Sequence, residues 1–271
     1  SPFVRGGYVH QLDSDLDAEG DFSVHRFYLQ TGVSYAVGPR RRVSFSVAGG
    51  SDRYDFSGGF GLADEPWGRI DQLRFSVPVT WAFDEHWTLF AVPTLRYSGE
   101  SGVGSRDAAT GGALAGVSYR VNDGLTIGPG VGVLGRLEDS VNVFPILIVD
   151  WKIIDRLSLE TGRGLGATQG PGLTLSYRLS ETWSLGLGGR YESLRFRLDD
   201  KGPAPDGVGE DRSIPVFVSA TYARDRDLRF SAVAGMELDG ELRLEDSSGR
   251  RLAREDYEST PFLGATFDIR F

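Results

Sequence analysis

The chain has 271 residues and a net charge of −9. This charge argues against a nucleic-acid partner, because such a partner requires a basic face. It contains no cysteine, so disulfides and thiolate metal sites are excluded, and no apolar run reaches the roughly 18 residues of a transmembrane helix. Neither a linker nor a shift in composition divides the sequence. We therefore predict one domain covering residues 1–271.

The first distinctive segment is the acidic loop "DSDLDAEGD". Ala18 stands where the sharp turn of a calcium loop needs glycine, and Val24 stands where its bidentate glutamate belongs. A solvated loop is therefore the favoured interpretation, and a divalent cation at the outer loops is the only cofactor left open. The carboxylates that would bind such a cation alternate along the loop: Asp13, Asp15, Asp17 and Glu19.

Strand periodicity dominates the rest of the chain. Residues 228–246 are the clearest case, with Leu228, Phe230 and Met236 on one face and Arg229 and Glu237 on the other. A modest apolar face opposite a charged face indicates a barrel that turns its apolar side toward lipid. Aromatic residues flank many of the predicted strand ends, as in a membrane girdle: Trp81, Trp87, Tyr97, Tyr119, Trp151, Tyr177, Trp183, Tyr191 and Tyr222.

Short and long connections alternate between these strands. The short ones are predicted periplasmic turns at 38–41, 84–86, 122–123, 154–156, 180–181 and 225–227. The longer ones are predicted outer loops at 12–21, 57–68, 99–112, 138–140, 162–171, 199–211 and 244–259. The fold class is therefore all-β, a closed antiparallel transmembrane barrel of about 14 strands. The outer link at 138–140 is very short and the strand at 156–163 is brief, so about 12 strands is the alternative.

The sequence ends on "TPFLGATFDIRF", in which every second residue is apolar. This segment resembles the C-terminal signal of Gram-negative outer-membrane proteins, carried here by Phe267, Ile269 and Phe271. The resemblance implies recognition by the barrel-assembly machinery. It also implies a location in the bacterial outer membrane, in contact with the lipid bilayer and lipopolysaccharide.

A second resemblance covers about two hundred positions. From about residue 70, the segments "GRLEDS", "VFPILIVDWKI", "TGRGLGATQGPGLTLSYRLSETWSLGLGG" and "GVGEDRSIPVF" are similar to a family of bacterial outer-membrane barrels carried as a domain of unknown function. This resemblance implies a barrel and supplies no activity.

Charged residues on the predicted inward face are the strongest functional feature. They either line a water-filled pore or pair across the interior and close it. Because 12 to 14 strands leave room for a narrow lumen, the leading prediction is a porin-like channel for small polar solutes. A non-conducting structural or interaction barrel is the alternative. The predicted lumen-lining residues are Arg74, Arg96, Arg120, Arg136, Glu138, Asp150, Lys152, Glu160, Arg178, Arg190, Glu192, Arg229, Glu237, Asp239 and Glu241.

An enzyme is the third hypothesis, and it rests on His10 and His25 flanking the acidic loop at the predicted outer rim. Outer-membrane phospholipases place a serine two residues after a histidine, but Phe27 follows His25 at that spacing and Leu12 follows His10. A general base also needs a partner within hydrogen-bond reach, and no second motif supplies one. We therefore expect no enzymatic activity and no catalytic residues, with a rim hydrolase as the least favoured function.

Overall fold

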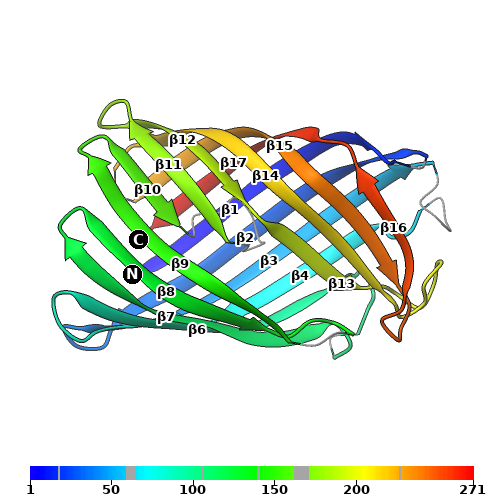
Figure 1. The fold of residues 1–271 in the computed structure, drawn as a ribbon, viewed down its shortest axis with the longest axis horizontal. Helices are drawn as coiled ribbons and strands as arrows, with labels where there is room; N and C mark the ends of the chain where they lie inside the picture. Colours follow the sequence, from blue (N-terminus) through cyan, green and yellow to red (C-terminus); the bar gives the residue numbers. More distant parts are fainter. Residues whose placement is uncertain (18, 59–64, 105, 139–140, 162–170, 226) are drawn as a thin grey trace.

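The computed structural model is a closed antiparallel β-barrel (Figure 1). It describes residues 1–271 except 18, 59–64, 105, 139–140, 162–170 and 226. The described residues contain no helix with the length and hydropathy needed to cross a membrane. Their strands, in chain order, are β1 (Pro2–Asp15), β2 (Asp21–Ala36), β3 (Arg41–Ser57), β4 (Arg69–Ser76), β5 (Val79–Ala82), β6 (Trp87–Glu100), β7 (Ala109–Asn122), β8 (Leu125–Leu134), β9 (Asn142–Ile154), β10 (Leu157–Thr161), β11 (Gly172–Arg178), β12 (Trp183–Arg190), β13 (Glu192–Arg197), β14 (Val208–Ala223), β15 (Leu228–Glu245), β16 (Arg251–Tyr257) and β17 (Thr260–Arg270).

Pairing between the first and last strands closes the sheet. β1 pairs with β2 on one edge and with β17 on the other, from Phe3 opposite Arg270 to Gln11 opposite Phe262. Three pairs of segments, β4 with β5, β12 with β13, and β16 with β17, each occupy one place in the wall. The described wall therefore has 14 strands, which confirms the favoured count over 12.

The two ends of the barrel differ as the sequence predicted. The short turns and both termini gather at one end, the turn end, and the described links between β13 and β14 and between β15 and β16 lie at the other, the loop end (Figure 1). Parts of five predicted outer links, residues 18, 59–64, 105, 139–140 and 162–170, and residue 226 of one predicted turn lie outside the described part of the chain. Aspartate side chains accept hydrogen bonds within several of these connections. In the link between β15 and β16, hydrogen bonds from the Ser248 side chain and the Arg250 backbone lower the pKa of Asp246 to about 2.

Apolar side chains cover the outside of the barrel. Phe45, Phe75 and Phe230 are each about half exposed, and Met236 is also exposed, so the predicted orientation of the apolar face is confirmed. Near the turn end, outward aromatic rings pair across neighbouring strands. The ring centroids of Trp87 and Tyr119 lie 4.7 Å apart, and those of Trp183 and Tyr222 lie 5.3 Å apart.

Inward-facing glycines allow aromatic rings to lie flat against the wall. A Cβ on Gly209 would meet the ring of Phe196 at 2.3 Å, and one on Gly188 would meet the ring of Phe217 at 2.5 Å. These glycines are required by the close approach of a ring from the neighbouring strand. The inner wall thus uses glycine where a ring from a neighbouring strand packs against it.

The wall narrows at the loop end. β6 pairs with β7 only as far as Tyr97 opposite Ala109, and just beyond that point β13 bridges to β6 in parallel, with Arg197 opposite Gly99. Leu16 likewise bridges to Tyr257, which joins the ends of β1 and β16. We call this narrower ring the collar; it comprises the loop-end segments of β1 to β4, β6 and β13 to β16.

We predict that the loop end faces the cell exterior. Because the sequence has no cysteine, Lys201→Cys and Glu85→Cys each introduce a single thiol, one at the loop end and one at the turn end. A membrane-impermeant maleimide added to intact cells should label the first variant and label the second only after the outer membrane is permeabilised. Labelling of Glu85→Cys in intact cells, with Lys201→Cys protected, would reverse the orientation.

Candidate functional site: the interior of the barrel

The turn-end half of the interior is polar and open to water. Short hydroxyl side chains face inward there and are only partly buried, although they lie inside the wall. Some pair across strands: Ser34 with Ser44 at 2.7 Å, and Thr221 with Ser231 at 2.8 Å. We call this space the vestibule; its hydroxyl lining is Ser34, Ser44, Ser118, Thr126, Ser158, Ser176, Ser184, Thr221 and Ser231.

Most of the charged residues predicted to line the lumen lie on the inward face. The strand register places them on the same face as the buried Ile70 and Phe217. Lys152 lies at the turn end, where it pairs with Asp155 at 2.8 Å. The inward residues are Arg74, Arg96, Arg120, Asp150, Lys152, Glu160, Arg178, Arg190, Glu192, Arg229 and Glu237.

Arg136 and Glu138 belong to the link between β8 and β9 instead of a strand. Arg136 binds Glu210 at 3.0 Å, and Glu138 binds Arg197 at 2.6 Å, so both attach this link to the collar. Their role is therefore at the loop end of the barrel.

Asp239 and Glu241 correct the prediction. The register shifts so that Arg212 lies opposite Glu241 whereas Ile214 lies opposite Leu238, which leaves a β-bulge at Asp239 and the following glycine. Asp239 has a φ of 50° and is exposed. An extra residue shifts the inward and outward alternation of side chains by one position. Beyond the bulge, residues of β15 that strict alternation would turn inward therefore face outward. Glu241 therefore faces outward.

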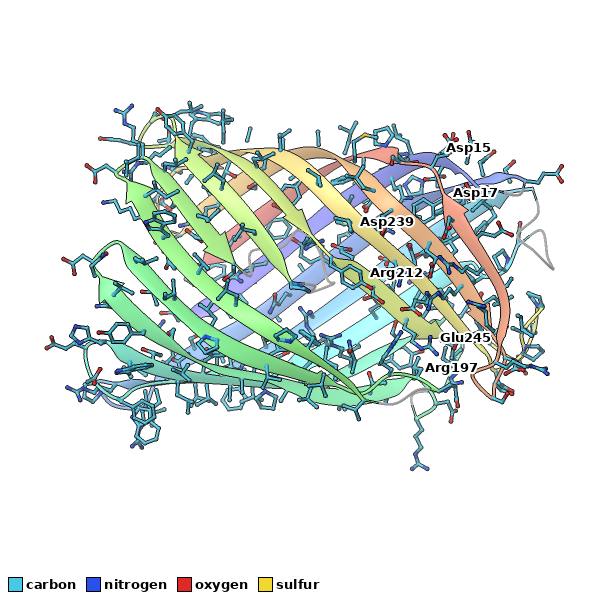
Figure 2. The ribbon with its side chains drawn as sticks, in the orientation of Figure 1. Asp15, Asp17, Arg197, Arg212, Asp239 and Glu245 are labelled. Carbon is cyan, nitrogen blue, oxygen red and sulfur yellow. The ribbon has the colours of Figure 1, made fainter. Side chains whose placement is uncertain are left out.

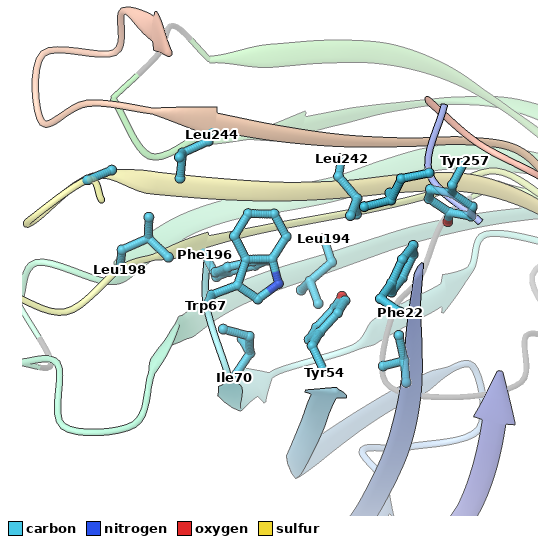
Figure 3. Close-up of a cluster of buried hydrophobic side chains, with 13 residues drawn as sticks. Phe22, Tyr54, Trp67, Ile70, Leu194, Phe196, Leu198, Leu242, Leu244 and Tyr257 are labelled. Atoms are coloured by element: carbon cyan, nitrogen blue, oxygen red, sulfur yellow. The ribbon is translucent and has the colours of Figure 1, made fainter. Parts of the chain in front are cut away.

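The collar is filled by apolar side chains (Figure 3). The Phe196 ring lies 5.2 Å from the ring of Trp67 and 6.3 Å from that of Tyr54, so residues from β13, β3 and the β3–β4 link meet in the interior. Each side chain of this cluster is at most 9% exposed, so the described side chains pack closely against one another there. We call it the plug: Leu16, Phe22, Val24, Tyr54, Trp67, Ile70, Leu194, Phe196, Leu198, Ala204, Leu242, Leu244 and Tyr257.

A buried charge network joins the walls at the plug. Asp211 on β14 accepts hydrogen bonds from Arg26 on β2 at 2.8 Å, from Tyr54 on β3 at 2.7 Å and from Tyr257 on β16 at 3.1 Å. Arg26 also donates to Gln11 at 2.8 Å. Since β14 and β3 are not neighbours in the sheet, these bonds span the interior.

Charged pairs cover the outer side of β13 to β15 at the loop end (Figure 2). Buried Glu210 accepts hydrogen bonds from Arg136, Arg195 and Ser193, and Arg195 also pairs with Glu245. Glu241 similarly binds Arg212 at 2.9 Å. Beyond them lies a polar pocket of about 570 Å³ whose lining includes Asp107, Glu138, Arg197, Asp199, Asp200 and Asp206.

The two histidines of the hydrolase hypothesis lie on the outward face. His10 and His25 stack with centroids 4.2 Å apart, and the Tyr8 hydroxyl lies 2.6 Å from His25 Nδ1. Asp55 is 3.9 Å from His25 Nε2. The stack lies on the barrel surface, where His25 has a hydrogen-bond partner in Tyr8, and the hydrolase hypothesis stays a prediction.

The acidic loop gives a similar result. Asp13 and Asp15 are exposed at the end of β1, and the Asp17 backbone amide donates to Asp256. Among the described residues, no group of three or more acidic, histidine or cysteine side chains is arranged to hold a metal ion. The cation site at Asp13, Asp15, Asp17 and Glu19 stays a prediction.

Sequence reasoning missed the plug, although β3 carries a pattern that reveals it. Near the turn end this strand turns Phe45 outward and Ser44 inward, whereas near the loop end it turns Asp55 outward and Tyr54 inward. The apolar residues thus exchange faces along one strand, without a bulge in its pairing with β2. Such an exchange indicates a strand that leaves lipid and continues as the wall of a water-exposed barrel.

No family model matches the chain and no curated protein matches its sequence, so the resemblance to the family of unknown function gains no support. Solved structures do match. The COG4313 outer membrane channel from Pseudomonas putida F1 is 11% identical with a TM-score of 0.56, covering 100% of this chain and 95% of that one. A Pseudomonas aeruginosa FadL homologue is 10% identical with a TM-score of 0.52, covering 99% and 88%. The P. putida toluene transporter TodX is 10% identical with a TM-score of 0.50, covering 100% and 90%. The chain therefore has the fold of outer-membrane β-barrels.

We predict that Asp211→Ala strongly destabilises the barrel. The change leaves buried Arg26 with only the more distant carboxylates of Asp52 and Glu237, each at 3.9 Å, and should cost about 3 kcal/mol of unfolding free energy. Tyr54→Phe should cost about 1 kcal/mol, because it removes one hydrogen bond.

Urea unfolding in lipid vesicles measures both changes, with the exposed Asp200→Asn as the matched control. Equal stability of Asp211→Ala and the control would show that the network contributes nothing to the closed state.

Proposed function

We propose that this chain is an outer-membrane channel for small solutes whose loop-end mouth is closed in the conformation described. The observation that carries the proposal is the contrast along the interior. A hydroxyl-lined vestibule leads inward from the turn end and meets the closely packed apolar plug at the loop end. A purely structural barrel has no need for a water-lined vestibule, whereas a channel with a gate needs both parts.

The lining of the vestibule supports small polar solutes as cargo. Serine and threonine hydroxyls replace part of a solute's hydration shell without binding it tightly, and conduction needs that balance. An apolar solute is the second candidate, because the plug is built of aromatic and aliphatic side chains. The chain shares its fold with TodX, which is named as a transporter of toluene, an apolar molecule.

The surroundings of the barrel follow from its outward face. The apolar band that includes Phe45 and Phe75 would contact the lipid bilayer, and above it the exposed ion pairs Arg53–Asp55 and Arg69–Asp71 would lie among lipopolysaccharide head groups. The last strand would enter the membrane through the assembly machinery, by the alternation of Phe267, Ile269 and Phe271.

We predict that weakening the plug opens the channel. In planar bilayers the wild-type barrel should show small, rare current steps, because its mouth is closed. Phe196→Ala removes the ring that packs against Trp67 and Tyr54, and it should raise the frequency and size of current steps several-fold.

Phe75→Ala is the matched control, since it removes an equal ring from the outward face and should leave the current unchanged. Gel mobility of unheated samples verifies that each variant is folded. If folded Phe196→Ala is as silent as the wild type, the non-conducting structural barrel becomes the better assignment.

A further inference from the structure

Three arginines surround one carboxylate on the outward face of the collar. Glu241 on β15 pairs with Arg212 on β14 at 2.9 Å and with Arg254 on β16 at 2.6 Å. It also pairs with Arg243, which lies two residues along its own strand. The register explains this meeting, because Arg212 lies opposite Glu241 and Arg243 lies opposite Arg254. We call the three basic residues the arginine cluster.

The basic and acidic groups of this cluster lie at different depths. The Glu241 side chain is only 3% exposed, whereas those of Arg212, Arg243 and Arg254 are 31%, 25% and 45% exposed. Asp256 lies 3.4 Å from Arg254 and balances one more charge at the edge. Three guanidiniums therefore face two carboxylates, and the one at the centre lies underneath them. The outer surface of the cluster is positive.

Other outward arginines at the loop end are paired differently. Arg53 pairs with Asp55 at 3.3 Å, and Arg69 pairs with Asp71 at 2.9 Å. The side chains of these two aspartates are 47% and 36% exposed, so each positive charge has a negative charge beside it at the surface. That part of the surface is neutral, which makes the arginine cluster a distinct feature of β14 to β16.

The arginine cluster borders the apolar band of the outer surface. Toward the turn end, the next outward pair after Arg212 and Glu241 is Ile214 and Leu238. Ile214 is 37% exposed, and Met236 beyond it is 38% exposed. Under the proposed outer-membrane location, acyl chains would cover these apolar side chains. The head groups of the same lipids would then lie at the level of the arginines.

We propose that Arg212, Arg243 and Arg254 bind a phosphate on the head group of lipopolysaccharide. A guanidinium presents paired N–H donors that match phosphate oxygens, and several guanidiniums together balance the charge of a phosphate. Because Glu241 already holds the three side chains together, binding costs little further conformational entropy. The neighbouring Ile214 offers a contact for acyl chains, which a free phosphate ion lacks.

This site goes beyond the proposed channel function and rests only on the proposed location in the outer membrane. It lies on the outside of the barrel, so it does not require an open lumen. A bound phosphate would join β14, β15 and β16 within the collar.

Thermal unfolding of the detergent-solubilised barrel tests the site. Bisphosphorylated lipid A should raise the unfolding midpoint by about 3 °C. Dephosphorylated lipid A and inorganic phosphate, each at the same concentration, should give no rise. The double variant Arg243→Gln/Arg254→Gln should lose the shift, although it keeps the pair between Arg212 and Glu241. The matched control Arg53→Gln/Arg69→Gln also removes two outward arginines and should keep the shift.

A chemical readout covers the case in which the first double variant fails to fold. Phenylglyoxal modifies arginines, and lipid A should slow modification of Arg243 and Arg254 in the wild type. It should have little effect on Arg53 and Arg69, because their exposed aspartates repel phosphate.

Four outcomes would each overturn the site: an equal shift with inorganic phosphate, an equal shift with dephosphorylated lipid A, a shift retained by the folded Arg243→Gln/Arg254→Gln variant, or equal protection of all four arginines. The channel is judged separately. A barrel that stays silent in bilayers but shows the lipid A shift would reject the channel and keep the site, and a conducting barrel without the shift would do the reverse.

Discussion

The hydrogen bonds between β1 and β17 join the two edges of one sheet, and the rest of the structure depends on that closure. In lipid, an open edge would leave unpaired amides and carbonyls with no water to satisfy them. Closing the ring with 14 strands removes the edges but encloses more space than the wall's side chains can fill. The interior must then hold water, hold a plug, or hold both. This barrel holds both, in separate halves.

Under the proposed outer-membrane location, the separation follows from a change of solvent along the strands. Near the turn end, lipid favours apolar side chains outside, and the water of the vestibule favours hydroxyls inside. Near the loop end, water surrounds the barrel, so charged residues such as Arg53 and Asp55 face outward and rings such as Tyr54 turn inward. The plug is thus the hydrophobic core of the collar, which extends the membrane barrel at its loop end. The Asp211 network joins the walls of this core and lies on its polar side.

The sequence predicted the features that repeat and missed those that depend on contact between distant strands. Fourteen strands, six short turns and an outward apolar face follow from a period of two and from turn composition, and the structure confirms them. The placement of Glu241 could not be derived, because strict alternation takes no account of the bulge at Asp239. The contact of Arg26 with Asp211 joins residues 185 positions apart, and no local pattern encodes it. The pairing of Arg74 with Arg96 likewise requires the register between two strands.

The bridge between Arg197 and Gly99 gives the mouth a mechanical property of its own. Backbone pairing there is limited to one pair of residues, supported by the Asp199 amide, which donates to the Glu100 carboxylate at 3.2 Å, whereas neighbouring strands of the main wall pair over long ladders such as that between β2 and β3. Under the proposed channel function, opening of the mouth would separate these two strand ends and leave the closure between β1 and β17 intact. The mouth would therefore widen without unfolding of the barrel wall.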